Sequence, residues 1–304
     1  MNTAAHPTAA FDPRIVPARM THSFLWSVRR ELMEHRSVTL GPLIVTGLFL
    51  IGFCISPHVD PARNHDLMNS FDIAAGFIMG AAFLIAVFYS LEALHSERRD
   101  RSILFWKSMP VSDATTVLSK AAIPIVFLPV LSYVLTVLTQ WTMLLLSSAV
   151  LAAHGMPVAP LWNTVPFFRN SVMLLYHLIL IHGLWYAPMW AFLLLVSAWA
   201  RRAPVLWAAL PIVAIAGMEK IVFNTSRFLN FLGERISGDG SDVPFTSSNH
   251  SANQAMDMTA DAMVTPAHLN FLHFLVNPGL WIGLLITAAF LYAAIQIRHR
   301  RSPL

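Results

Sequence analysis

The chain has 304 residues, of which 56% are hydrophobic and only 12% are charged, and its formal net charge is +4. Soluble domains carry about 25% charged residues, so this composition predicts an integral membrane protein and excludes an ordinary soluble enzyme. The basic residues lie beside apolar runs rather than along one groove, which argues against nucleic-acid binding. The single cysteine, Cys54, offers neither a disulfide framework nor a cysteine metal cluster.

Residues 1–38 are predicted to form a cytoplasmic tail followed by an amphipathic helix. The first part is rich in Ala, Pro and Thr, and it lacks the short apolar core of a signal peptide. From Thr21 to Val38, apolar side chains recur at helical spacing and charged side chains occupy the other side of the helix, and Arg30 and Glu34 are placed for an i,i+4 ion pair. This helix would lie in the membrane interface; an extension of the first transmembrane helix is the alternative. Its candidate residues are Phe24, Leu25, Val28, Arg29, Arg30 and Leu32.

Six apolar runs follow, and each approaches or exceeds the length of about 20 residues that crosses a bilayer. They predict an all-α polytopic membrane protein with six transmembrane helices over residues 39–299. Pro124, Pro129 and Pro188 are expected to kink these helices, because proline lacks a backbone donor. The runs are Leu40–Ser56, Phe71–Leu94, Ala121–Ala153, Ser171–Trp199, Pro204–Phe223 and Pro278–Ile297.

The distribution of basic residues predicts the orientation of the chain. Of the 20 Lys and Arg residues, 15 lie in segments that share one side of the membrane. Cytoplasmic segments are enriched in Lys and Arg, so both termini, including residues 300–304, are expected in the cytoplasm. Residues 224–277 then form a large external loop. The five basic residues on that side are Arg63, Arg169, Lys220, Arg227 and Arg235.

The charged segment 95–120 lies between two membrane-length apolar runs, so it must lie in water on the cytoplasmic face. Residues 97–107 have helix-forming composition, and Phe105 and Trp106 offer an apolar edge to a partner. Pro110 is expected to stop this helix, and Asp113 is expected to cap the next one. The segment is suited to docking in a groove of another protein. A solvated loop that only follows the charge rule is the alternative.

The same segment resembles the permease subunits of type-2 ABC transporters. It contains an acidic residue, Glu97, followed by basic residues, then S-I-L-F-W-K-S-M-P-V-S from Ser102, and finally Ser119-Lys120. Arg101 and Ser119 stand where that family usually has glycine. The motif covers a small part of the chain, and the six-span plan agrees with the family.

The resemblance implies that the segment is a coupling helix that receives motion from cytosolic ABC ATPase subunits, and that the amino-terminal helix is a connecting helix at the lipid interface. Two permease chains, as a homodimer or heterodimer, would form an exporter in a cell membrane, the bacterial inner membrane by analogy. ATP and Mg²⁺ would be held by the ATPase, and this chain would bind no cofactor. The implied coupling residues are Glu97, Arg98, Arg99, Arg101, Phe105, Trp106, Lys107 and Pro110.

The chain is not expected to be an enzyme, because it has no phosphate-binding loop, no H-E-x-x-H motif and no G-x-S-x-G motif. Its polar residues within spans are candidate pathway residues. His177 and His182 are five residues apart, so they are expected to share a helix face poorly and to hydrogen-bond within the bundle. Glu219 and Lys220 either pair at the interface or mark the exit of a pathway.

Two other classes of function stay open. The chain could be a secondary carrier that works without an ATPase, or a membrane scaffold for the assembly of other proteins. A permease-like subunit that transmits motion without moving substrate is a further alternative. The external loop also contains thioether and imidazole side chains, which suit copper but are irregularly spaced; no metal site is predicted from them. They are His250, Met256, Met258, Met263, His268 and His273.

Overall fold

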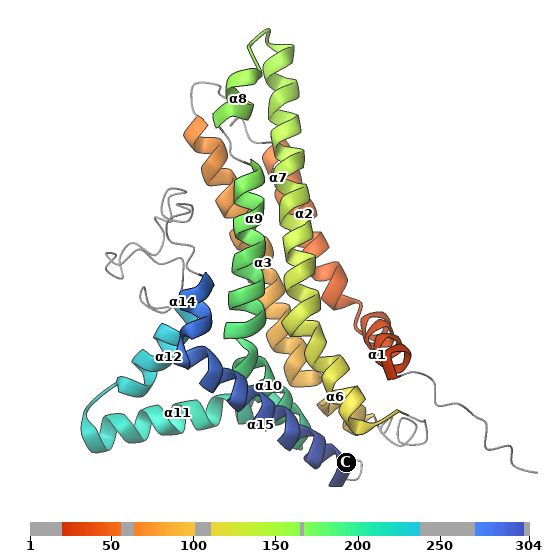
Figure 1. The fold of residues 1–304 in the computed structure, drawn as a ribbon, viewed down its shortest axis with the longest axis vertical. Coiled ribbons are helices and arrows are strands. Elements are labelled where there is room, and N and C mark those ends of the chain that lie inside the picture. The colour runs from red at the N-terminus through yellow and green to blue at the C-terminus, as the bar shows by residue number, and fades with distance from the viewer. Residues whose placement is uncertain (1–19, 56–63, 101–110, 165–166, 238–270, 301–304) are drawn as a thin grey trace, which may run out of the picture.

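The computed structural model describes residues 20–55, 64–100, 111–164, 167–237 and 271–300, and these ranges contain helices and no strand. The predicted all-α fold is therefore confirmed for the described residues (Figure 1). The helices are α1 (Met20–Glu34), α2 (Ser37–Ile55), α3 (Asn64–Glu92), α4 (His95–Arg99), α6 (Asp113–Ala122), η1 (Ile123–Phe127), α7 (Leu128–Ala153), α8 (Ala159–Thr164), α9 (Phe167–His177), η2 (Leu178–Trp185), α10 (Ala187–Trp199), α11 (Pro204–Phe223), α12 (Arg227–Ser237), α14 (Phe271–Val276) and α15 (Pro278–Arg300).

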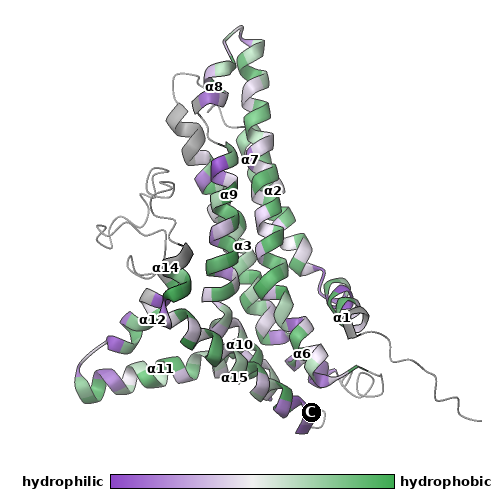
Figure 2. Ribbon diagram, viewed as in Figure 1, coloured by the Kyte–Doolittle hydropathy of each residue, from purple (hydrophilic) through white to green (hydrophobic). Residues whose placement is uncertain are grey.

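Six helical stretches among the described residues are long and apolar enough to cross a membrane, which makes this a multi-pass membrane protein. Many large apolar side chains are exposed, and Figure 2 shows the hydrophobic residues of these helices in green. The fourth stretch ends at Trp185 rather than at Trp199 as predicted, because a turn at Tyr186 separates it from α10. The stretches are Ser37–Ile55, Ser70–Arg99, Asp113–Ala153, Ala159–Trp185, Pro204–Phe223 and Pro278–Arg300.

The centre of the bundle is formed by α3 and α7, which run side by side with α2 along the long axis of the molecule (Figure 1). Below them, α10 packs along α15 and also contacts α3. Trp190 of α10 is 1% exposed, and its ring lies edge-on to Phe83 of α3, with 5.2 Å between the ring centroids. This aromatic contact is part of the hydrophobic core between α3 and α10.

Two of the long helices contain π-helical segments, η1 and η2, which pack against each other. η1 includes Pro124, one of the prolines predicted to kink a span, and Pro188 follows the turn at the end of η2. Gly183 allows a close approach here, because a Cβ atom at this position would lie 3.3 Å from the carbonyl oxygen of Ile125. Proline and π-helical turns both interrupt the regular α-helical hydrogen bonds.

α11 leaves the bundle at a steep angle and has one buried residue, Ala208 (Figure 1). It begins after Ala203 and ends before Asn224, and both of these flanking residues have positive φ angles, of 46° and 49°. Asparagine tolerates this left-handed conformation at a helix end better than most residues. An apolar helix that is exposed on nearly all sides is typical of a membrane span in contact with lipid.

α12 is held against the bundle by Arg235, whose guanidinium lies 3.5 Å from the centre of the Trp185 ring. The same guanidinium donates to the carbonyl oxygens of Trp185 and Gly279, and the Trp185 indole N–H donates back to the Arg235 carbonyl at 2.9 Å. Gly283 of α15 leaves room for this side chain, because a Cβ atom there would lie 2.6 Å from Nη2 of Arg235. The contact joins α12, η2 and α15.

We predict that Gly283→Ala destabilises the protein, although alanine normally favours a helix by about 1 kcal/mol over glycine. The added methyl group would lie 2.6 Å from Nη2 of Arg235 and 3.2 Å from Cγ of Pro188, so the guanidinium must shift, and the loss of its hydrogen bonds should cost about 1–3 kcal/mol. The apparent melting temperature in detergent measures this. Gly47→Ala is the matched control, because nothing lies within 4 Å of a Cβ atom at Gly47. Equal melting temperatures for the Gly283→Ala and Gly47→Ala proteins would contradict the prediction.

Candidate functional site: a buried ionic cluster

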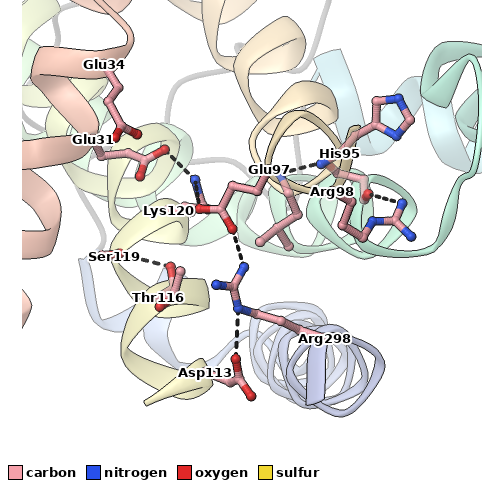
Figure 3. Close-up of polar contacts among 12 residues, drawn as sticks. Glu31, Glu34, His95, Glu97, Arg98, Asp113, Thr116, Ser119, Lys120 and Arg298 are labelled. Atoms are coloured by element: carbon pink, nitrogen blue, oxygen red, sulfur yellow. Dashed lines mark hydrogen bonds and ion pairs between the residues drawn. The ribbon is translucent and has the colours of Figure 1, made fainter. Parts of the chain in front are cut away.

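Charged side chains from four helices meet at the end of the bundle that holds α1, the start of α6 and the end of α15 (Figures 1 and 3). Each makes at least one ion pair with another member of the group. The group is mostly buried, and Lys120 and Glu31 are each only 1% exposed. We call it the ionic cluster; its members are Arg30 and Glu31 of α1, Glu97 of α4, Asp113 and Lys120 of α6, and Arg298 of α15.

α6 places two members of the cluster at its ends. The helix begins after Ser112, whose side-chain oxygen accepts a hydrogen bond from the Thr115 backbone N–H at 3.0 Å. The prediction that Asp113 caps this helix is therefore wrong, because Ser112 occupies the capping position. The Asp113 carboxylate is left available for Arg298, whose Nε lies 3.0 Å from it. Lys120 lies two turns further along, on the buried side of the same helix.

Lys120 is the cation at the centre of the cluster. Its Nζ lies 2.5 Å from a carboxylate oxygen of Glu31 and 3.1 Å from a carboxylate oxygen of Glu97. Figure 3 shows the ammonium between these two acidic side chains. An ammonium buried this deeply is stable only when carboxylates compensate its charge. Lys120 therefore fixes α1 and α4 against α6.

Glu97 connects the Lys120 side of the cluster to α15. One oxygen of its carboxylate faces Lys120 and lies 3.7 Å from Nη2 of Arg30, while the other accepts from Nη1 of Arg298. Arg298 is 5% exposed and also reaches Asp113. The three cations of the cluster thus face three carboxylates, and its formal charge is zero.

α4 is fixed by a second set of contacts, with the end of α10. The Ser197 hydroxyl accepts from the backbone N–H groups of Leu94 and His95, both at 3.0 Å. The buried guanidinium of Arg98 donates to the backbone carbonyls of Ser197 and Ala200. These are carbonyls at the carboxyl end of a helix, where a cation is favourable. These contacts fix α4, the helix that carries Glu97, against the end of α10.

Glu31 has an unusual environment for a carboxylate. Burial works to raise its pKa, but the Lys120 ammonium and hydrogen bonds from His35 and Lys120 outweigh burial and lower the pKa from 4.5 to about 2. His35 Nε2 lies 3.4 Å from Oε1 of Glu31, the carboxylate oxygen that also contacts Lys120. Glu31 is therefore ionised at neutral pH in spite of its burial.

The predicted coupling residues divide into three groups. Glu97 and Arg98 are buried in the contacts described above, whereas Arg99 is exposed and pairs with Asp100 at 3.1 Å. α4 ends at Arg99, so the described part of the predicted helix is shorter than the sequence pattern indicated. The other predicted coupling residues lie outside the described residues; they are Arg101, Phe105, Trp106, Lys107 and Pro110.

The predicted amino-terminal helix is present as α1, and the predicted ion pair between Arg30 and Glu34 is confirmed at 3.0 Å. Val28 and Leu32 pack against the core of the bundle, and Phe24 is also partly buried. Leu25 and Arg29 are exposed. The helix thus packs on α6 through one side and leaves the other side uncovered.

The structure corrects the expectation that His177 and His182 share a face poorly. Their ring centroids are 5.5 Å apart, and the His182 ring lies edge-on to Tyr186. The reason is η2, because a π-helical turn places residues i and i+5 one above the other. Nδ1 of His182 is buried without a hydrogen-bond partner. The pair adjoins the aromatic contact of Trp190, whose indole N–H donates to the His182 carbonyl at 3.3 Å.

Glu219 has a structural role that the sequence pattern did not reveal. Its carboxylate accepts from the backbone N–H groups of Arg227 and Phe228, at 2.6 and 2.8 Å, and from the Thr225 hydroxyl. It therefore caps the start of α12, as an acidic side chain does at a helix amino terminus. Lys220, its predicted partner, is exposed on α11.

No group of three or more His, Cys, Asp or Glu side chains among the described residues could hold a metal ion. The His and Met side chains considered for copper lie in residues 250–273, and the structure describes only the backbone of the last of them, His273. The cluster itself has its carboxylates occupied by ammonium and guanidinium groups. These ion pairs connect α1, α4, α6 and α15 to one another.

Sequence reasoning missed the roles of Glu31, Asp113, Lys120 and Arg298. One signal for Glu31 was present, because it lies on the same helix face as Val28 and Leu32, where a carboxylate needs a buried partner. The partner could not be read from the sequence, since Lys120 is 89 residues away.

We predict that Lys120→Met destabilises the protein strongly, because Glu31 and Glu97 lose their shared cation while both stay buried. Removal of one partner of a buried ion pair costs about 3–5 kcal/mol. The apparent melting temperature in detergent should fall accordingly. Lys220→Met is the control, since exposed Lys220 should change stability by at most about 0.5 kcal/mol. Equal melting temperatures for the two variants would refute the central role of Lys120.

The depressed pKa of Glu31 also predicts a pH dependence. Because the folded-state pKa is below the unfolded value, ionised Glu31 stabilises the fold fully above about pH 4.5, by about 3 kcal/mol. This stabilisation is lost as the pH falls from about 4.5 towards 2. Melting temperatures measured along this range should fall more steeply for the unmodified protein than for Glu31→Gln. Glu34→Gln, a change at a more exposed carboxylate of α1, should keep the steep fall of melting temperature with pH. A melting temperature of the unmodified protein that does not change over this pH range would contradict the prediction.

Comparison with protein-family models, with curated proteins and with solved structures finds no match to this chain. The function is therefore inferred from the cluster and from the segment beside it.

Proposed function

We propose that this chain is the membrane-spanning permease subunit of an ATP-driven ABC exporter. In this proposal, segment 101–110 receives the motion of cytosolic ATPase subunits and passes it to the transmembrane helices. The observation that supports it best is the ionic cluster, because the segment begins and ends beside the cluster. Glu97 and Arg98 precede the segment, and Asp113 and Lys120 follow it.

The contacts of the cluster determine which helices a force on this segment would reach. A displacement of α6 acts on α1 through the Lys120–Glu31 pair and on α15 through the Arg298–Asp113 pair. α6 also continues through η1 into α7, the longest helical stretch of the described residues. On the other side, Arg98 joins the segment to the end of α10. One docked partner would thus act on five helices together.

The proposal includes an orientation and a composition. Both termini and the cluster face the cytoplasm, in accord with the excess of Lys and Arg on that side, and α1 lies at the membrane interface. Two permease chains work with two ATPase subunits, which hold ATP and Mg²⁺; the chain itself is not an enzyme. The membrane is a cell membrane, the bacterial inner membrane by the family resemblance.

A secondary carrier is the second candidate, and the pair of His177 and His182 favours it. Buried imidazoles within a transmembrane helix are typical of proton and substrate pathways. The two proposals differ in their energy source. Transport by the chain reconstituted alone, without ATP, would support the carrier and exclude the ABC permease.

The first experiment is purification of the chain in mild detergent together with an ABC ATPase encoded beside its gene. The proposal expects a stable complex whose ATP hydrolysis differs from that of the ATPase alone. The absence of any associated ATPase would overturn the proposal.

We predict that Phe105→Ala/Trp106→Ala uncouples the ATPase, because the sequence pattern predicts that these two side chains offer an apolar edge to a partner. In the complex, ATP hydrolysis should return to the rate of the free ATPase, while the melting temperature of the permease should not change. Phe168→Ala/Trp141→Ala is the matched control; both side chains are exposed on other helices, so hydrolysis should keep its coupled rate. Retained coupling in a well-folded Phe105/Trp106 variant would refute the docking role.

A further inference from the structure

We infer that the uncovered side of α1 binds the anionic headgroup layer of the membrane, with its arginines on lipid phosphates. The inference deepens the proposed function, since it rests on the placement of α1 at the membrane interface. We call this side the outer face; it consists of Leu25, Trp26, Arg29 and Met33 of α1 and of Arg36, which follows the helix.

The outer face is a continuous strip of the helix. At about 100° of rotation for each residue, its four helical members fall within an arc of about 100°. Leu25, Trp26 and Met33 are 64%, 62% and 54% exposed. These are large apolar side chains, and their exposure on a helix that is too polar to span the membrane calls for a covering environment.

The outer face carries positive charge without any carboxylate. Arg29 and Arg36 are both exposed. The two acidic residues of α1 are directed elsewhere, because Glu31 is buried against Lys120 and Glu34 pairs with Arg30. A face with apolar and basic side chains alone is complementary to a boundary where acyl chains meet phosphate groups.

Trp26 and Arg29 are arranged as a unit, with the guanidinium 5.3 Å from the centre of the indole ring. Tryptophan is favoured at the depth of lipid headgroups, where its ring is partly apolar and partly polar. A guanidinium held over this ring can bind phosphate oxygens in its plane, since the planar fork matches their geometry.

The membrane is favoured over a soluble partner because the outer face continues into a lipid-facing surface. α2 begins at Ser37, directly after Arg36, and it is a candidate span. Its first exposed large apolar side chains are Leu40, Leu43 and Ile44, at 49%, 46% and 58% exposure. Arg36 therefore lies where the apolar surface of the span begins. In a membrane, this position is at the depth of the lipid headgroups.

Binding of lipid on this face would also act on the ionic cluster. α1 carries Glu31 on its opposite side, where it pairs with Lys120 of α6. The helix is thus fixed between the headgroups and the cluster, so anionic lipid supports the position of α1 against α6.

The test uses the full purified chain in nanodiscs, without ATPase or nucleotide, so that its failure is distinct from a failure of the proposed function. In a Cys54→Ala background, Leu25→Cys carries a fluorophore that doxyl lipids quench. The nanodiscs contain either doxyl-phosphatidylglycerol or doxyl-phosphatidylcholine at equal content. The inference expects stronger quenching by the anionic lipid, with a local preference on the order of five-fold for each arginine in contact, and a loss of this preference in high salt.

Two controls make the result specific. Arg29→Gln/Arg36→Gln should abolish the preference, whereas Arg201→Gln/Arg202→Gln, a change of two exposed arginines between α10 and α11, should retain it. A fluorophore at Leu48→Cys, within α2, should be quenched equally by the two lipids. Equal quenching at position 25 would overturn the headgroup preference. No quenching at position 25 would show that water or a protein covers the outer face and would overturn membrane binding itself.

Discussion

The arrangement of the helices at one end of this protein depends on the burial of a single ammonium group. Lys120 is 1% exposed, so its charge must be balanced within the protein, and two carboxylates from different helices do this. Each carboxylate then constrains another element: Glu97 requires Arg298 of α15, and Glu31 fixes the side of α1 that faces the bundle. None of these helices can move away alone without leaving a buried charge unpaired. The cluster therefore makes the helices respond as a group.

The transmembrane helices could be predicted from the sequence because length and hydropathy are local properties. The cluster could not, because its pairs join residues 89, 185 and 201 positions apart in the chain. Asp113 illustrates the difference: its position before a helix is typical of a capping residue, yet Ser112 takes that role and Asp113 binds Arg298. Local patterns identify which residues can cap or pair. Only the packing of the helices decides which partner they have.

The π-helical segments explain a second limit. A helix wheel with 3.6 residues per turn separates His177 from His182, whereas the wider turn of η2 brings their rings within 5.5 Å. Proline at position 124 indicated an irregular helix but not its type. The close approach of η2 to the Ile125 carbonyl of η1 at Gly183 is a tertiary contact, which a local sequence pattern does not specify.

These two features lie on one continuous path. α6 carries Asp113 and Lys120, and it passes directly into η1, which contacts η2 beside the His177 and His182 pair. π-Helical turns interrupt the α-helical hydrogen-bond pattern, and long helices bend at such interruptions. Under the proposed function, a displacement of α6 would reach η1 directly and η2 through the Gly183 contact. In that proposal, the ion pairs of the cluster hold the helices together at the outer part of this path, and the π-helical segments form its inner part.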